Sequence, residues 1–422
     1  MKKVVIAEAG PSYNVGSMAL IENAVKIAKE QLNATEVVVL CPDIEGVRET
    51  LNRMGYKNVV VTNDVFRFKP GLSAVAKAWW LLEAVAWIAY AKIVTKVFAK
   101  AAPFFTGHKK VVFGHVDDAE VIICIGAERI NDVYFKTALL SLYALEMFQN
   151  LGKKLIHMSL TIGPVFYKST IWKAKRIMKK SAAIVVRDQK SSDLLKEWGV
   201  DSRIVYRSYD IALLQSEGTD NMKCSVVGRY GLDSMEGYVA VSIINWRFRC
   251  VKGPVRQDGY EQAMADMLDY IVERYGRRVV FTNTVIPGDA KTAERVIAKM
   301  KHPEATVNIK ELLSPEEMVE VFAHARYAVV TRMHAAILAS GAGRTPVIAV
   351  NYLYKLREYM KNIGMEDMSV DIDVVTSECL IGLADKMELH YDDVVEVLDG
   401  RRKLMTETLM SHVHRLKTDC LQ

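Results

Sequence analysis

The stretch SPEEMVEVFAHARYAVVTRMHAAILAS, residues 314–340, contains a helix, a strand and a second helix in direct succession. Ser314 is a typical N-cap residue, followed by proline at the first helical position and a glutamate at the capping-box position, so a helix is predicted to about His324. Tyr327–Thr331 is a short apolar run typical of a buried strand, and Met333–Ser340 is predicted to be the next helix. Alternating helices and strands are the building pattern of an α/β fold.

The same alternation extends along almost the whole chain and predicts parallel sheets covered by helices. In the first half, strands are expected near residues 3–7, 36–40, 58–62, 120–125, 153–158, 182–186 and 203–206. In the second half, they are expected near residues 238–244, 278–283, 305–308, 327–331 and 347–350. A polar segment at 216–237 separates the two series and is predicted to be a linker. The predicted fold is α/β, with two doubly wound Rossmann-like domains and a central cleft.

The length of 422 residues agrees with this organisation, since a domain typically has about 150 residues. The expected domains are residues 1–220 and 237–389, followed by a helical, charged segment at 390–422. A basic, tryptophan-bearing helical insertion is expected at about 65–116 within the first domain.

Composition narrows the class of protein. Half of the residues are hydrophobic and a quarter are charged, which excludes a mainly disordered chain. The six cysteines include no Cys-x-x-Cys pair, so neither a disulfide framework nor a zinc knuckle is expected. Lys2 and Lys3 precede only four apolar residues before Glu8, which is too short a run for a secretory signal. A cytoplasmic protein is therefore expected.

The net charge of +6 is concentrated in one segment. Residues 65–110 contain one acidic residue, Glu83, and eight basic ones, so this segment carries +7 and the rest of the chain −1. The basic residues are Arg67, Lys69, Lys77, Lys92, Lys96, Lys100, Lys109 and Lys110. Trp79, Trp80 and Trp87 lie in the same, mostly aliphatic, segment. This combination favours an interfacial helical hairpin on an anionic membrane surface, with core or oligomer-forming helices as the alternative.

Arg332 and His334 follow the strand predicted at 327–331. The carboxyl ends of strands are where open α/β sheets bind ligands, and a following helix directs its N–H groups to the same place. Arg332 is therefore a candidate for binding a phosphate or carboxylate. The same spacing is compatible with Arg332 pairing with an acidic side chain and His334 being a hydrogen-bonded structural residue.

The sequence around this strand, and shorter pieces elsewhere, resemble the polysaccharide pyruvyl transferase family. The strongest part covers about 326–372 and includes Thr331-Arg332-Met333-His334, Gly343-Arg344-Thr345-Pro346, Asn351-Tyr352, Lys355 and Ile363-Gly364-Met365. The shorter pieces are Asn14-Val15-Gly16 with Ala19, Gly126, Ile162-Gly163-Pro164, Val186-Arg187-Asp188 with Ser191, and Asp210. The resemblance implies two domains like those of the glycosyltransferase B fold, with the acceptor on the first and the donor on the second.

By this resemblance, the protein transfers a pyruvyl group from phosphoenolpyruvate (PEP) to a sugar of a cell-surface polysaccharide or its lipid-linked precursor, leaving a pyruvate ketal. PEP is the donor substrate, and no cofactor or metal is expected. Arg332 would bind the phosphate and carboxylate of PEP, and His334 would be the general acid that protonates its methylene carbon. Lys355 is expected to hold the phosphate, although a solvated lysine at a helix start fits equally. Tyr352 is a further substrate-binding candidate, with packing as its alternative role.

In the first part of the chain, the resemblance makes Asn14, Gly16, Ser17 and Gly163 substrate-binding candidates. The family usually has an aspartate where this chain has Ser17, which cannot serve as a carboxylate base. Glu8, at the end of the first predicted strand, is a candidate substitute.

A second departure from the family lies after the first strand of the second domain. Ser242-Ile243-Ile244 lacks the arginine that the family tends to have two residues after the serine or threonine. Arg247 follows soon after and is a candidate to supply that charge.

A nucleotide-sugar glycosyltransferase is the nearest alternative, because it would use the same two-domain architecture. Glu358 and Glu366 have the Glu-x7-Glu spacing of many retaining glycosyltransferases, but the segment between them lacks a glycine-rich phosphate loop. The absence of P-loop and Gly-x-Gly-x-x-Gly motifs gives no support for ATPase or dinucleotide chemistry.

A nonenzymatic membrane-surface protein using residues 65–110 is the alternative from another class. Nucleic acid is not an expected partner, because the aromatic residues sit in an apolar, helix-like run. A membrane-spanning helix is not expected either. Lys77 and Glu83 interrupt the run Leu72–Ala91, and its longest uncharged stretch is eight residues.

Overall fold

The structure, a computed structural model, describes residues 3–67, 71, 73–216, 225–235, 237–245 and 256–421. The chain divides into two compact units, each an α/β unit with one parallel sheet. The first unit comprises Met1–Ser12, Leu20–Ile211 and Thr408–Gln422, and the second comprises Tyr13–Ala19 and Ala212–Glu407. The predicted α/β class is confirmed.

The first unit contains a seven-stranded sheet with the order β3-β2-β1-β4-β5-β6-β7. Its strands are β1 (Lys3–Ala7), β2 (Glu36–Cys41), β3 (Val59–Asn63), β4 (Val121–Cys124), β5 (Lys154–Leu160), β6 (Ala183–Val186) and β7 (Val205–Arg207). All neighbouring strands pair in parallel, and the central strands are almost entirely buried. Continuous Val and Ile runs suit this position, because both faces of the sheet are covered.

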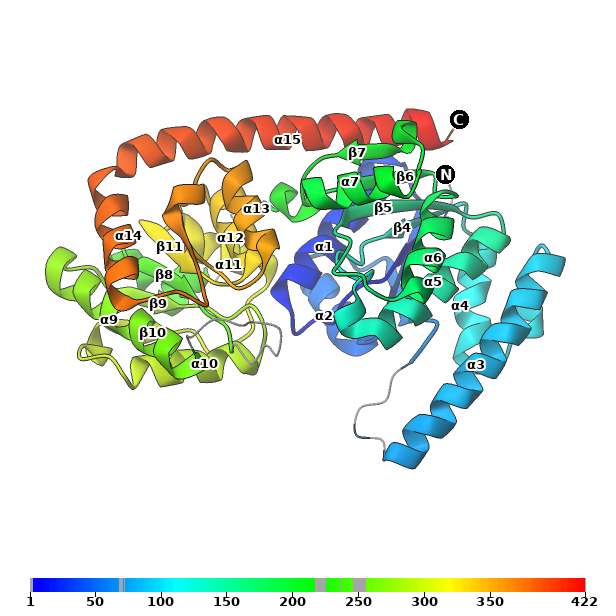
Figure 1. The fold of residues 1–422 in the computed structure, drawn as a ribbon, viewed down its shortest axis with the longest axis horizontal. Helices are drawn as coiled ribbons and strands as arrows, with labels where there is room; N and C mark the ends of the chain where they lie inside the picture. Colours follow the sequence, from blue (N-terminus) through cyan, green and yellow to red (C-terminus); the bar gives the residue numbers. More distant parts are fainter. Residues whose placement is uncertain are drawn as a thin grey trace. The chain divides into compact units, whose positions relative to one another are not determined.

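Seven longer helices accompany this sheet in the described residues. They are α1 (Val15–Lys26), α2 (Ile44–Arg53), α3 (Ala74–Val97), α4 (Gly107–Asp118), α5 (Phe135–Asn150), α6 (Lys168–Met178) and α7 (Gln189–Glu197). The first residues of α1 belong to the second unit. The insertion expected at about 65–116 contains α3 and most of α4, and Figure 1 shows α3 extending away from the sheet of the first unit.

The second unit contains a six-stranded parallel sheet with the order β10-β9-β8-β11-β12-β13. Its strands are β8 (Val239–Ser242), β9 (Val279–Phe281), β10 (Thr306–Asn308), β11 (Tyr327–Val330), β12 (Val347–Asn351) and β13 (Ser369–Asp371). The sequence analysis missed β13, because three residues with a single apolar side chain give no strand signal. β13 is defined by its pairing with β12, where Val350 lies opposite Val370.

Eight helices of the described chain follow the first strand series. They are α8 (Val226–Arg229), α9 (Gln257–Tyr275), α10 (Gly288–Ile297), α11 (Pro315–Ala323), α12 (Met333–Ile337), α13 (Tyr354–Asn362), α14 (Ser377–Leu389) and α15 (Tyr391–Leu421). The predicted capping box of α11 is present: Ser314 Oγ accepts from the Glu317 backbone N–H at 3.1 Å, and Glu317 Oε2 accepts from the Ser314 N–H at 2.8 Å. The helix predicted at 333–340 begins as α12 but continues from Leu338 to Ala342 as a π-helical turn.

Among the described residues, α3 is the one helix long and apolar enough to cross a membrane by length and composition.

Candidate active site

The candidate site of the second unit is built on neighbouring parallel strands. β9, β8, β11 and β12 are adjacent in the sheet, so their carboxyl ends lie at one edge. Polar side chains lie at or just after the ends of three of these strands: Thr282, Asn283 and Thr284 at β9, Thr331, Arg332 and His334 at β11, and Asn351, Tyr352 and Lys355 at β12. This edge is where doubly wound folds bind their ligands.

Arg332 lies at the N-cap of α12 and pairs with Asp289 in the first turn of α10. Its Nε and Nη2 donate to Asp289 Oδ2 and Oδ1 at 3.2 and 2.6 Å. Asp289 is fully buried and also accepts from Thr284 Oγ1 and the Val285 N–H, both at 3.0 Å. Arg332 therefore pairs with an acidic side chain, as the second interpretation of the sequence had it. The pair fixes the guanidinium through Nε and Nη2, while Nη1 takes no part in the contact with Asp289.

His334 lies against the first turn of α1, which here belongs to the second unit. A Cβ atom added to Gly16 would lie 2.3 Å from both Cγ and Nδ1 of His334, far inside contact distance. Only glycine allows the helix backbone to approach the imidazole this closely. The structure thus brings together two sequence-predicted residues that are far apart in the chain.

The turn around Gly16 is held on the second unit by backbone hydrogen bonds. The Val15 N–H donates to the Thr284 carbonyl at 3.0 Å, and Asn14 forms a bridge with Val285. Asn14 Oδ1 accepts from the Ser17 N–H at 3.2 Å and so caps the start of α1. Asn14 and Ser17 therefore shape the turn that contacts His334.

Tyr352 and Lys355 follow β12, the neighbour of β11 in the sheet. The Lys355 ammonium lies 5.5 Å from the centre of the Tyr352 ring, a cation–π contact. Lys355 occupies the first turn of α13, where the helix dipole disfavours a positive charge. A bound anion at this strand edge would relieve that repulsion.

Gly163, Arg247 and the Glu358/Glu366 pair are the remaining residues singled out in the sequence. Gly163 belongs to the first unit, where its φ of 111° requires glycine and its N–H donates to the Ile130 carbonyl at 2.8 Å. Arg247 lies outside the described residues. Glu358 lies in α13 and Glu366 in the short turn before β13.

Asp289 and Thr284 are the site residues that sequence reasoning missed. The signal available was the polar run Thr282-Asn283-Thr284 directly after a buried strand, with an aspartate at the start of the next helix. Nothing in that run identifies Arg332 as the partner, because the contact depends on how the strands are ordered in the sheet.

Glu8 in the first unit has an unusual environment. Its φ is 63°, an uncommon conformation for a residue with a Cβ atom, and its carboxylate accepts a hydrogen bond from Ser141 Oγ. Burial raises the pKa of Glu8, against the opposing effects of the Ser141 hydrogen bond and the Arg129 charge. Position 126 next to it is glycine, and a Cβ atom added there would lie 2.6 Å from Glu8 Oε2.

Glu8 also forms a buried group with Cys124 and His157, whose ligand-type atoms all lie within 4.8 Å of one another. Burial raises the pKa of the Cys124 thiol well above its usual value and lowers the pKa of His157 to about 4. His157 Nε2 lies 3.1 Å from Ser181 Oγ. Burial thus shifts all three groups toward their uncharged forms.

Replacing Arg332 by leucine is expected to lower the free energy of unfolding by about 3–5 kcal/mol, because Asp289 would stay buried without its charged partner. Adding Asp289→Asn should recover part of the loss, since asparagine can still accept from Thr284 and Val285. Denaturant unfolding of the two single variants and the double variant measures this coupling. If the losses of unfolding free energy in the two single variants simply add up in the double variant, Arg332 and Asp289 do not stabilise each other.

Comparison with known proteins identifies one family and several solved structures of the same fold class. The family model described as polysaccharide pyruvyl transferase matches residues 14–354. The amylovoran biosynthesis protein AmsJ of Erwinia amylovora is 21% identical over 286 residues, covering 65% of this chain and 67% of that protein.

Solved structures resemble the chain at low sequence identity. The UDP-GlcNAc 2-epimerase of Methanocaldococcus jannaschii is 13% identical, with a TM-score of 0.57 over 91% of this chain and 92% of that one. HepE of Anabaena, in complex with UDP-glucose, is 11% identical, with a TM-score of 0.57 over 100% and 99%. The glycotransferase of kitacinnamycin is 12% identical, with a TM-score of 0.55 over 99% of each chain. These similarities place the fold in the glycosyltransferase B class.

Proposed function

Since this chain belongs to the polysaccharide pyruvyl transferase family, we propose that it transfers the pyruvyl group of PEP to a sugar of a cell-surface polysaccharide or its lipid-linked precursor. The product is a pyruvate ketal and the leaving group is phosphate. The observation that supports the proposal is the position of His334 and Arg332 at the carboxyl edge of the second sheet, with Gly16 against the imidazole.

PEP presents a phosphate and a carboxylate, and the strand edge offers two cations for them. Arg332 is held in one orientation by Asp289, so its Nη1 can donate to an anion with little further loss of side-chain freedom. Lys355 supplies a second positive charge from α13, which follows the neighbouring strand β12. Arginine suits the planar carboxylate, whereas lysine acts on phosphate as a point charge.

His334 is the proposed general acid. A sugar hydroxyl oxygen forms a bond to C2 of PEP while a proton from the imidazolium is added to the methylene carbon, which becomes the methyl group. A second hydroxyl oxygen then bonds to C2 as the C–O bond to phosphate breaks, and this gives the ketal. Of the two hydroxyl protons, one restores His334 and the other leaves with phosphate. Histidine suits this role because its ordinary pKa lies near neutral pH.

PEP is expected to stabilise the protein without any acceptor present. At about 100 times its dissociation constant, a ligand that binds only the native state adds about 2.7 kcal/mol. This corresponds to roughly 5–10 °C in melting temperature for a domain of about 200 residues. Thermal unfolding with PEP, uridine diphosphate and guanosine diphosphate measures the difference. A shift with a nucleotide or nucleotide sugar but not with PEP would favour the glycosyltransferase alternative.

The stabilisation should depend on the lysine at the start of α13. Lys355→Ala should reduce the PEP-induced shift, while Lys361→Ala, in the last turn of the same helix, should leave it unchanged.

With a competent acceptor, the wild-type protein should release phosphate and add a pyruvate ketal to the glycan.

A further inference from the structure

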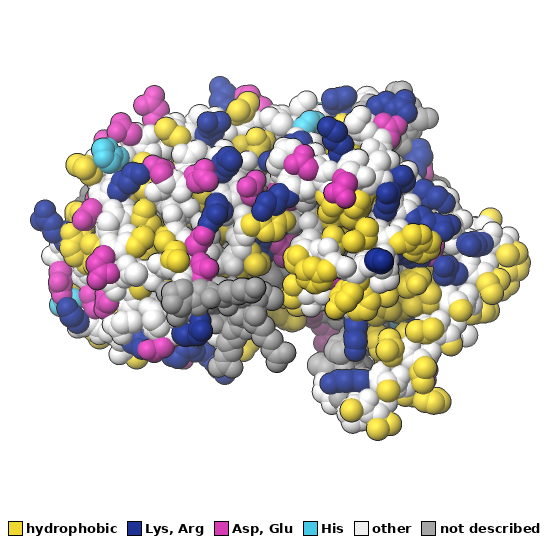
Figure 2. Space-filling model, in the orientation of Figure 1, with side chains coloured by type: hydrophobic (Ala, Val, Ile, Leu, Met, Phe, Trp, Pro, Cys, Tyr) yellow, Lys and Arg dark blue, Asp and Glu magenta, His cyan; other side chains and the backbone are white. Residues whose placement is uncertain are grey.

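The outward face of α3 is apolar, the reverse of an ordinary surface helix. Val75, Trp79, Leu82, Ile93 and Val97 are all more than 60% exposed. Their spacing places them on one side of the helix. Figure 2 shows hydrophobic side chains along α3, with basic side chains beside them. An apolar stripe of this length on a soluble surface indicates an interaction site.

The opposite side of α3 is fixed to the first unit. Ile88, Ala91 and Val94 belong to its hydrophobic core, and Ala84 is also buried. Trp87 packs beside them against Phe66, Phe105 and Phe113, with ring centres 5.4 to 6.2 Å apart. A helix anchored along one side can lie on a membrane, but it cannot be surrounded by lipid.

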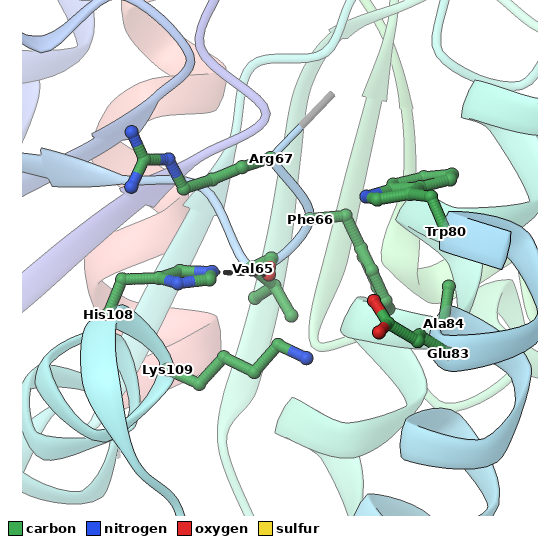
Figure 3. A pocket seen from close by; sticks show the side chains of 8 residues that line it. All are labelled: Val65, Phe66, Arg67, Trp80, Glu83, Ala84, His108 and Lys109. Atoms are coloured by element: carbon green, nitrogen blue, oxygen red, sulfur yellow. Dashed lines mark hydrogen bonds between the residues drawn. The ribbon is translucent and has the colours of Figure 1, made fainter. Parts of the chain in front are cut away.

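A basic pocket of about 350 Å³ lies beside the amino-terminal half of α3 (Figure 3). Arg67 comes from the segment after β3, His108 and Lys109 come from α4, and Trp80 and Glu83 come from α3. The pocket also includes Val65, Phe66 and Ala84. The lining thus combines apolar surface with two basic side chains, Arg67 and Lys109, and one acidic side chain, Glu83.

Figure 3 shows the side chains of Arg67 and Lys109 extending toward different sides of the pocket. The Lys109 ammonium lies 3.8 Å from the centre of the Trp87 ring. Burial lowers the pKa of Lys109 to about 8, and the Glu83 charge opposes this shift, so the ammonium form predominates at pH 7. Burial also lowers the pKa of His108, whose Nε2 lies 3.3 Å from the Val65 carbonyl, and this favours the neutral form of the ring. Glu83, the acidic residue of the pocket, accepts a hydrogen bond from Trp79 Nε1 through its Oε1 at 2.9 Å.

We propose that α3 lies in the interface of an anionic lipid bilayer, with its apolar face at the acyl boundary and anionic lipid headgroups at the pocket that Arg67 and Lys109 line. The charge of the segment favours this occupant over a second copy of the chain. Lys77, Lys96 and Lys110 are exposed around the helix and would repel the same residues of a symmetry mate, whereas they attract anionic headgroups. This proposal does not depend on the proposed catalytic function.

Flotation with vesicles, without PEP or acceptor, tests the apolar face. The full-length protein should bind phosphatidylcholine vesicles containing phosphatidylglycerol, and Trp79→Ser/Leu82→Ser/Ile93→Ser should bind at least about 100-fold more weakly. The matched control is Val374→Ser/Leu389→Ser/Leu404→Ser, which changes three exposed apolar residues of the second unit and should bind like wild type. Circular dichroism confirms that each variant is folded.

The pocket is tested by comparing anionic with neutral vesicles. Arg67→Gln/Lys109→Gln should lose most of the preference for phosphatidylglycerol, while Lys361→Gln/Lys403→Gln should keep it. The proposal is overturned if the triple serine variant of α3 floats like wild type, or if the Arg67/Lys109 variant keeps its preference. It is also overturned if the serine changes convert a dimer into a monomer and the monomeric protein does not bind vesicles.

Discussion

His334→Ala is expected to lower kcat for pyruvyl transfer by about 10²- to 10⁴-fold, the usual contribution of a positioned general acid. The apparent affinity for PEP should change much less, because Arg332 and Lys355 are the proposed anion contacts. Steady-state phosphate release at varied PEP concentration measures kcat and KM separately. PEP-dependent thermal stabilisation of the variant gives the affinity without turnover.

A matched control for this change is His324→Ala. His324 ends α11 on the surface of the same unit, where its Nδ1 lies 3.0 Å from the Glu320 carbonyl. Its removal should leave kcat within about twofold of wild type, as expected for a surface substitution away from the site. Wild-type turnover in His334→Ala would disprove the acid assignment, whatever its effect on stability.

Gly16→Ala is expected to be nearly as damaging, although it adds a single methyl group outside the proposed chemistry. The new Cβ would lie 2.3 Å from the His334 ring, so either the imidazole or the first turn of α1 must move. A displacement of about 1 Å at a reacting group can cost about 10²-fold in rate, and overpacking typically costs 1–3 kcal/mol of stability. Phosphate release and thermal unfolding measure the two effects.

Gly382→Ala is the corresponding control. Gly382 lies within α14, and a Cβ atom added there meets no other group within 4 Å. The substitution should leave activity unchanged and can raise stability slightly, since alanine is favoured over glycine in a helix. Equal activity of Gly16→Ala and Gly382→Ala would mean that the approach of α1 to His334 does not matter for catalysis.

The amino-acid sequence predicted the elements that local chemistry determines. Runs of Val, Ile and Ala identify the interior strands β1 and β8, since fully buried parallel strands need apolar residues on both faces. The Ser314 capping box was predicted in full, because its two hydrogen bonds join residues three apart. The three-residue strand β13 was missed, since its definition depends on pairing with β12.

The site shows the same division between local and long-range information. The sequence placed Arg332 and His334 at a strand end, because that follows from the order of elements around them. It could not identify Asp289 as the partner of Arg332 or Gly16 as the neighbour of His334, since both contacts are set by tertiary packing. For α3, the sequence favoured an interfacial helix, but it could not identify which side would be exposed, because the lysines form no single face of the helix.

Neither unit is a single continuous segment of the polypeptide, and this affects the order in which each can be completed during synthesis. The first unit includes Thr408–Gln422, and within that stretch Leu409, Val413 and Leu416 are buried, while the His412 ring lies 5.5 Å from that of Tyr206. The second unit ends at Glu407. The unit that begins to emerge first from the ribosome is therefore the last to receive all of its residues. A stop codon after Glu407 would remove part of the amino-terminal unit and leave the later one whole.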